Sequence, residues 1–144
     1  MRSLEDMQQV AQEILPLIED HRIVLLKGDL GSGKTTLTQH LCQGLDLDLL
    51  MSSPTYSIIN EYEISSCNIE NVRKIYHIDL YRLSDLEEAI QIGIEDYLDN
   101  EQALCFVEWP ELIESLLEKA LLIEIKHNKN ESRQIIIYLY NGLV

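Results

Sequence analysis

Hydrophobic residues recur along this 144-residue chain with two different periods, which divide it into predicted helices and strands. From Ser3 to about Glu19, apolar residues return every three or four positions, and Ser3 followed by Glu5 and Asp6 is typical of a helix N-terminus. The apolar face of this predicted helix consists of Met7, Val10, Ala11, Ile14, Leu15 and Ile18. A second amphipathic helix is predicted over residues 36–45.

Short apolar runs separated by polar segments predict strands. These runs cover residues 23–26, 58–64, 74–79, 104–108, 121–125 and 134–140, with polar turns at 65–71 and 127–133. Residues 83–98 predict a helix interrupted near Gly93, and residues 111–119 predict a short helix. The alternation of strands and helices predicts an α/β fold whose mixed, mostly parallel sheet has antiparallel edge strands and is flanked by helices.

Length and composition favour one compact domain over residues 1–144, because 46% of the residues are hydrophobic. The longest apolar runs are far too short to span a membrane, and the polar N-terminus does not read as a secretion signal. The three cysteines are odd in number and lack the spacing of a metal site, so reduced thiols are expected. A cytoplasmic protein without membrane association is therefore predicted.

The formal net charge of −14 limits the partners that the chain can bind. Proteins that bind nucleic acids directly present basic patches to the phosphates, whereas here 11 Lys and Arg are dispersed among 25 Asp and Glu. Tight, direct binding of tRNA or DNA is not expected. A role in a nucleic-acid pathway would therefore be indirect, through a protein partner.

Residues 28–35 read G-D-L-G-S-G-K-T, which is the complete phosphate-binding loop motif G-x-x-x-x-G-K-[ST]. A predicted strand precedes the motif and a predicted helix follows it, so that backbone N–H groups can surround phosphates at the helix N-terminus. Lys34 is expected to hold the β- and γ-phosphates, and the Thr35 hydroxyl to bind Mg²⁺. The predicted nucleotide-binding residues of this segment are Asp29, Leu30, Gly31, Ser32, Gly33, Lys34, Thr35 and Thr36.

Asp79 and Glu108 each end a predicted hydrophobic strand. Open α/β sheets bind ligands at that position, and a phosphate-loop enzyme needs one acidic residue for Mg²⁺ and one group that orients or deprotonates the nucleophile. Lys34, Asp79 and Glu108 are thus the candidate catalytic residues. The residues alone leave open which carboxylate holds the metal, and either could be a solvated strand end or a helix cap.

An ordered series of motifs makes the chain similar to the TsaE family. They are the loop at 28–36, S-P-T-Y at 53–56, H-I-D-L-Y-R-L at 77–83, G-I-E-D-Y at 93–97 and V-E-W-P at 107–110. The resemblance implies a small bacterial ATPase that uses ATP and Mg²⁺ and acts with TsaB and TsaD. Together these proteins install threonylcarbamoyl on adenosine beside the anticodon of tRNAs that read codons starting with adenine. Together with the acidic charge, this predicts contact with tRNA only through the complex.

The same resemblance implies roles for individual residues. Glu108 would bind magnesium together with Thr35, and Asp79 would lie near the nucleotide and take part in hydrolysis. Arg133 stands where family members contact nucleotide. Thr55 lies in a segment that resembles a switch responding to the γ-phosphate.

Trp109 and His77 each have two interpretations. Trp109, the only tryptophan, is predicted either to anchor a nucleotide-sensitive or partner-facing surface or to plug the end of the sheet. His77 lies two positions before Asp79 and so shares its sheet face, where a hydrogen-bonded structural role is favoured over that of a general base.

Three functions agree with these residues. The first is a weak ATPase that partners stimulate, the second is a small-molecule kinase, and the third is a nucleotide-gated binding module with negligible turnover. Kinases of this type need a lid with several arginines. The chain has only dispersed arginines, namely Arg2, Arg22, Arg73, Arg82 and Arg133. Water is therefore the expected phosphoryl acceptor.

Overall fold

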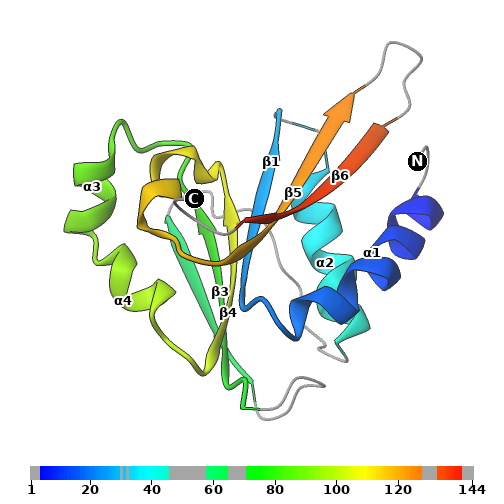
Figure 1. Ribbon diagram of the computed structural model, residues 1–144, viewed down its shortest axis with the longest axis horizontal. Coiled ribbons are helices and arrows are strands. Elements are labelled where there is room, and N and C mark those ends of the chain that lie inside the picture. The colour runs from blue at the N-terminus through cyan, green and yellow to red at the C-terminus, as the bar shows by residue number, and fades with distance from the viewer. Residues whose placement is uncertain are drawn as a thin grey trace.

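A six-stranded sheet in the order β2-β3-β4-β1-β5-β6 forms the centre of the molecule (Figure 1). The computed structural model describes residues 4–29, 31, 33–45, 58–64, 71–127 and 133–140. Its strands are β1 (Ile23–Gly28), β2 (Ile59–Glu63), β3 (Lys74–Asp79), β4 (Ala103–Glu108), β5 (Ala120–His127) and β6 (Arg133–Tyr140). The four central strands are parallel, while β2 and β6 are antiparallel edges, which confirms the predicted mixed sheet.

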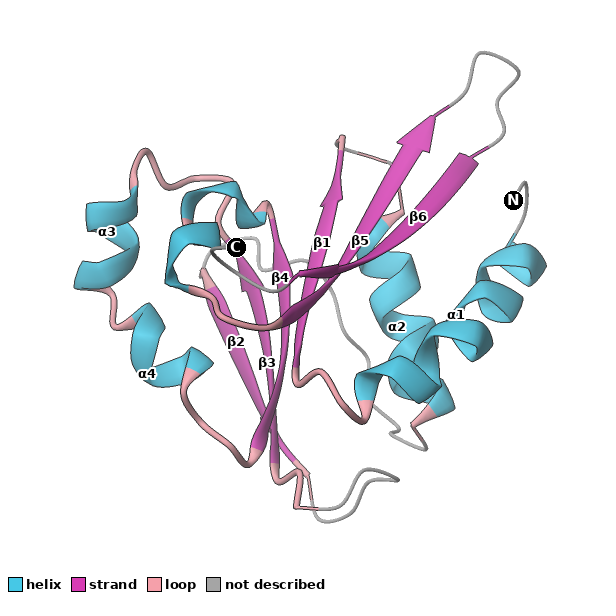
Figure 2. Ribbon diagram, in the orientation of Figure 1, coloured by secondary structure: helices cyan, strands magenta, loops and turns pink. Residues whose placement is uncertain are grey.

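Helices cover both faces of the sheet (Figure 2). The helices α1 (Leu4–Ile18) and α2 (Lys34–Gly44) pack on one face, and α3 (Leu86–Gln91) and α4 (Ile94–Leu98) lie on the other. The central strand β4 is buried along its whole length because its side chains alternate between the two cores. Phe106 faces the core beneath α1 and α2, and Val107 faces the core beneath α3 and α4.

Two helix predictions need correction. The helix predicted over residues 83–98 begins only at Leu86, because the Asp85 side chain accepts a hydrogen bond from the Glu88 N–H at 3.0 Å and caps the helix there. Its predicted break falls at Gly93, between α3 and α4. The predicted helix over residues 111–119 is instead two single-turn 3₁₀ helices, η1 (Pro110–Leu112) and η2 (Glu114–Leu116).

The backbone around η1 and η2 explains their shortness. Trp109 takes a left-handed conformation (φ 57°) and Pro110 follows it, so the chain turns sharply as it leaves β4. Leu117 is already extended, which leads the chain back toward β5. No α-helix of usual length fits between these two points. In the part of the chain that the structure describes, no helix is long and apolar enough to cross a membrane.

The strand order brings three functional segments to one edge of the sheet. The strands β3, β4 and β1 are adjacent and parallel, so their carboxyl ends lie together. Asp79 pairs in register with Glu108, and Leu26, two residues before the start of the phosphate loop, pairs with Glu108 from the other side. Both candidate carboxylates therefore lie at the edge where the loop leaves β1.

Candidate functional site

The described backbone of the loop has the conformation that its glycines permit. Gly31 (φ 78°) and Gly33 (φ 109°) both lie in the left-handed region, which side chains other than glycine rarely adopt. Gly33 is the N-cap of α2, so Lys34, Thr35 and Thr36 form the first turn of the helix. The loop thus ends at the positive end of a helix dipole, a position suited to anions.

Lys34 is held inside the loop that it belongs to. Its ammonium donates hydrogen bonds to the carbonyl oxygens of Gly28 at 2.5 Å and Asp29 at 3.2 Å, and lies 4.0 Å from the centre of the Trp109 ring. The side chain is only 5% exposed. Burial lowers the pKa of Lys34 because it removes the ammonium from water, and the nearby carboxylates, Glu108 first among them, oppose that shift.

Glu108 connects β4 to the phosphate-loop helix. The Thr35 hydroxyl donates to Glu108 Oε2 at 3.1 Å, a contact between residues 73 positions apart in the sequence. His77 Nε2 lies 2.5 Å from the same oxygen. Glu108 is only 3% exposed. Its buried carboxylate is hydrogen-bonded to Thr35 of α2 and to His77 of β3.

Asp79 lies beside Glu108 in the sheet register but has a different environment. Its Oδ1 accepts a hydrogen bond from the Tyr81 N–H at 3.0 Å, which fixes the turn that follows β3. Burial raises the pKa of the Asp79 carboxyl, because it disfavours the charged form, while the Tyr81 N–H acts in the opposite direction. The geometry therefore favours Glu108 as the partner of Thr35, with Asp79 next to Glu108 in the sheet register.

Every buried polar or charged side chain among the described residues belongs to this region. These side chains are Lys34, Thr38, His77 and Glu108. The Thr38 hydroxyl donates to the Lys34 carbonyl at 3.0 Å and so is satisfied within α2. Because burying polar groups is costly, the proximity of Lys34, His77 and Glu108 marks this region as the candidate functional site.

The contact between His77 and Glu108 was not predicted from the sequence. The alternation of side chains along residues 74–79 predicted that His77 shares the sheet face of Asp79. A hydrogen-bonded structural role was favoured for this histidine. The partner could not be predicted, because it depends on β3 and β4 being neighbours.

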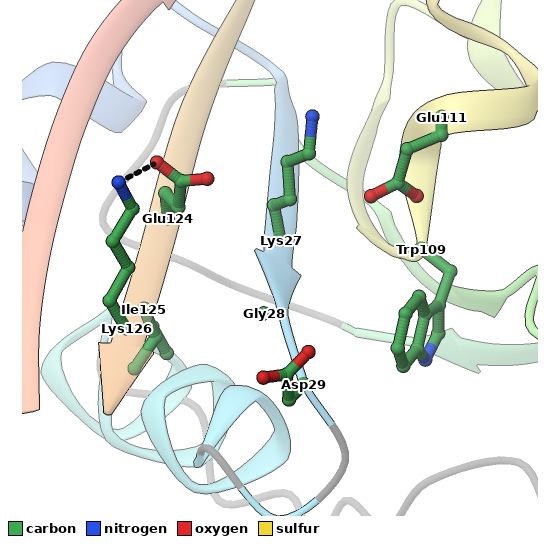
Figure 3. Close-up of a pocket in the computed structure, with 8 residues that line it drawn as sticks. All are labelled: Lys27, Gly28, Asp29, Trp109, Glu111, Glu124, Ile125 and Lys126. Atoms are coloured by element: carbon green, nitrogen blue, oxygen red, sulfur yellow. Dashed lines mark ion pairs between the residues drawn. The ribbon is translucent and has the colours of Figure 1, made fainter. Parts of the chain in front are cut away.

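A cavity of about 370 Å³ opens beside the start of the loop (Figure 3). Its lining consists of Lys27, Gly28, Asp29, Trp109, Glu111, Glu124, Ile125 and Lys126. Figure 3 shows Trp109 and Glu111 on one side of β1, and the residues of β5 on the other. The two lysines form ion pairs, Lys27 with Glu114 at 3.9 Å and Lys126 with Glu124 at 3.6 Å. Only Gly28, Asp29 and Trp109 of this lining fall within the sequence motifs, and Glu124, Ile125 and Lys126 line it because β5 lies beside β1.

The donor atoms fit a magnesium ion that is bound together with a nucleotide. Among the described residues, no group of three or more His, Cys, Asp and Glu side chains could hold a metal alone. Mg²⁺ does not need such a group, since it usually takes one or two protein ligands and completes its shell with phosphates and water. The Thr35 hydroxyl donates its proton to Glu108, so its oxygen lone pairs remain suited to a cation.

Some predicted site residues lie outside the described part of the chain. This applies to Leu30, Ser32 and Thr55, and also to the side chain of Arg133. The backbone of Arg133 begins β6 and pairs with His127 of β5. The roles predicted for these four residues stay predictions.

The fold and the loop together define the class. The protein has the α/β fold of phosphate-loop NTPases, with a mixed, mostly parallel sheet in which the loop joins β1 to α2. The family model described as "Threonylcarbamoyl adenosine biosynthesis protein TsaE" matches residues 1–135. The chain belongs to the TsaE family.

Individual relatives agree with this family. The chain is 40% identical over 122 residues to the tRNA threonylcarbamoyladenosine biosynthesis protein TsaE of Haemophilus influenzae, a match covering 83% of this chain and 73% of the relative. The Bacillus subtilis protein of the same name is 35% identical over 132 residues, covering 91% and 78%. Among solved structures, the crystal structure of Bacillus subtilis YdiB aligns with a TM-score of 0.67 at 28% identity, over 99% of this chain and 83% of that one.

Proposed function

We propose that this protein is a Mg²⁺-dependent ATPase subunit of the machinery that adds threonylcarbamoyl to adenosine in tRNAs reading codons that begin with adenine. Its proposed partners are the TsaB and TsaD proteins, with tRNA reached only through that complex. The names of the relatives support the pathway. The strongly acidic charge agrees with an indirect contact with tRNA.

The observation that carries the ATPase proposal is the hydrogen bond between Thr35 and Glu108. It joins the last residue of the loop motif to a buried carboxylate at the end of the neighbouring strand, where a phosphate-loop enzyme needs its metal ligands. A glycine-rich turn that arose by chance would have no reason to bury a carboxylate against its threonine.

Each residue would have a distinct task. Thr35 and Glu108 would hold Mg²⁺, which when bound neutralises charge on the phosphates. Lys34 would exchange the loop carbonyls of Gly28 and Asp29 for phosphate oxygens, because a charged acceptor forms a stronger hydrogen bond with an ammonium than a neutral carbonyl does. Asp79 would position water for attack, consistent with a carboxylate that lies beside Glu108 but caps its own turn.

The distribution of charge supports dependence on a partner. Four carboxylates, Asp29, Asp79, Glu108 and Glu111, act electrostatically on the Lys34 ammonium. A nucleoside triphosphate adds further negative charge, and one magnesium ion offsets only part of it. Such NTPases turn over slowly until a cation arrives from elsewhere, often from a partner protein. We therefore expect slow hydrolysis by the isolated chain and clear stimulation by TsaB and TsaD.

The test compares the chain alone with the reconstituted complex. ATP hydrolysis would be measured for each in Mg²⁺ and in EDTA, with Lys34→Ala as the inactive control, and threonylcarbamoyladenosine would be measured in the nucleosides of added tRNA. Equal turnover with and without partners would contradict the proposal. Transfer of phosphate to a small metabolite in place of water would favour a kinase, and ATP binding without turnover in either state would favour a nucleotide-gated binding module.

A further inference from the structure

His77 is the one buried polar side chain of the described residues whose role the loop motif and the strand-end carboxylates do not explain. Lys34 and Glu108 are part of the site, and Thr38 is satisfied by a backbone carbonyl within α2. His77 is fully buried in β3, on the face that packs against α1 and α2. An apolar side chain at such a position would avoid the cost of burying an imidazole.

The hydrogen-bond geometry defines the state of the imidazole ring. Glu108 Oε2 is an acceptor, so Nε2, at 2.5 Å, is the nitrogen that carries the proton. Nδ1 has no hydrogen-bond partner among the described residues. Within the described part of the chain, the ring therefore makes its one hydrogen bond to Glu108.

The same carboxylate oxygen also orients the loop threonine. Oε2 accepts from Thr35 Oγ1 at 3.1 Å and from His77 at 2.5 Å. A shift of this oxygen would change the direction in which the Thr35 hydroxyl donates, and with it the direction of the hydroxyl lone pairs. His77 is thus connected through Glu108 to Thr35, in the first turn of α2.

We propose that His77 is a positioning residue for the metal part of the nucleotide site. Its Nε2–H holds the Glu108 carboxylate in the orientation that Thr35 and a magnesium ion require. Residues that fix metal ligands in this way typically change metal affinity by about 10- to 100-fold when removed. This inference rests on the proposed function, because it assumes that Thr35 and Glu108 bind metal.

The experiment measures binding rather than turnover. Mn²⁺, used as the probe for Mg²⁺, would be titrated by electron paramagnetic resonance into the protein with a non-hydrolysable ATP analogue, and the affinity for that analogue would be measured separately in EDTA. His77→Leu removes the donor, while His77→Gln keeps an N–H group that can reach Glu108. Ile75→Val, at a buried site on the same face of β3, is the control for general loosening of the strand.

The inference predicts a specific pattern. His77→Leu should weaken Mn²⁺ binding by about 10-fold or more with unchanged affinity in EDTA, His77→Gln should recover most of the loss, and Ile75→Val should change neither. If His77→Leu does not fold, His77→Asn takes its place, because its shorter amide falls short of Glu108.

Three results would overturn the inference. The first is Mn²⁺ affinity in the Leu or Asn variant equal to that of the unaltered protein. The second is an equal loss of affinity for Mn²⁺ and for the analogue in EDTA, which would mean that His77 has only a structural role. The third is a Gln variant no better than the variant without a donor. If the unaltered protein binds the analogue in EDTA but no Mn²⁺, the metal assignment itself fails. If the unaltered protein binds neither the analogue nor Mn²⁺, the proposed function fails as well.

Discussion

The ammonium of Lys34 lies 4.0 Å from the centre of the Trp109 ring, so the lysine of the phosphate loop is covered by an aromatic side chain from the end of β4. The left-handed backbone at Trp109 places the ring there. The Tyr81 ring packs against the Trp109 ring, with the ring centroids 5.0 Å apart. The Tyr81 side chain is itself exposed. Lys34, Trp109 and Tyr81 thus form a continuous contact from the buried ammonium to the surface.

Replacing Lys34 with Ala should abolish productive ATP binding. The loop would lose the cation that the structure places beside its carbonyls, and charge-assisted contacts to phosphate are among the stronger hydrogen bonds. Because the chain has one tryptophan, its emission reports on Trp109 alone. Titration with ATP should change that emission in the unaltered protein and leave it constant in the Ala variant. Unaltered ATP affinity in the variant would refute the loop assignment.

Glu108 and Asp79 should affect different parameters. Glu108→Ala removes the carboxylate that is bonded to Thr35, and we expect a loss of Mg²⁺-dependent nucleotide binding, because a metal ligand acts in the ground state as well. Asp79→Asn should spare binding and lower turnover by about 10²-fold or more, as expected of a group that positions water. Nucleotide titrations paired with hydrolysis assays test this pair, and the opposite pattern would mean that the two roles are exchanged.

The pattern of strands predicted this pair of carboxylates but not their different contacts. Asp79 and Glu108 were found because each follows a hydrophobic strand, and strand ends are a local feature of the sequence. Their contacts are not local. The bond from Thr35 to Glu108 spans 73 positions, and the contact between His77 and Glu108 requires β4 to lie between β3 and β1.

Local backbone effects explain where the predicted elements were wrong. Residues 111–119 have the composition of a helix, but the left-handed turn at Trp109 and the extended backbone at Leu117 leave room only for two 3₁₀ turns. At the start of α3, Asp85 caps the helix later than the apolar pattern indicates, since a side-chain cap overrides periodicity. By contrast, β3 was predicted with its observed bounds, because its short apolar run is flanked by polar residues.

Asp79 should make the stability of the protein depend on pH. Burial raises the pKa of its carboxyl above its ordinary value of 3.8, so the folded state holds the proton more tightly than the unfolded state does. The free energy of unfolding therefore falls as pH rises from about 3.8 through the raised pKa of Asp79. At pH values above that raised pKa, the buried Asp79 charge destabilises the folded state to its full extent. Asp79→Asn removes the charge and keeps an oxygen that can accept from the Tyr81 N–H.

We therefore expect Asp79→Asn to unfold at a higher temperature than the unaltered protein at neutral pH, and the difference should vanish below the ordinary pKa of an aspartate. Thermal unfolding followed by circular dichroism across this pH range measures it. Asp85→Asn is the matched control, because its exposed side chain also accepts a backbone N–H, and it should gain no stability at neutral pH. A neutral-pH gain at Asp85 as large as that at Asp79 would show that burial is not the cause.

Trp109 should matter more for partner-dependent turnover than for binding of ATP. Its ring contributes a cation–π contact to Lys34, worth about 0.5 to 2 kcal/mol, and Lys34 keeps its loop contacts without it. We expect Trp109→Ala to change ATP affinity by about 30-fold at most, the upper end of that range. Stimulation by TsaB and TsaD should fall further, because among the described residues the Trp109 ring connects Lys34 to the exposed Tyr81 side chain.

The test measures ATP affinity, basal turnover and partner-stimulated turnover for Trp109→Ala and Trp109→Phe. Phenylalanine retains a ring over Lys34 and should keep most of the stimulation. Leu139→Ala is the control for loss of an exposed apolar side chain elsewhere, since Leu139 lies on the edge strand β6. It should leave all three parameters unchanged. A Trp109→Ala variant that loses ATP affinity and stimulation in equal proportion would assign Trp109 to nucleotide binding alone, and the surface that it shares with Tyr81 would have no part in coupling to partners.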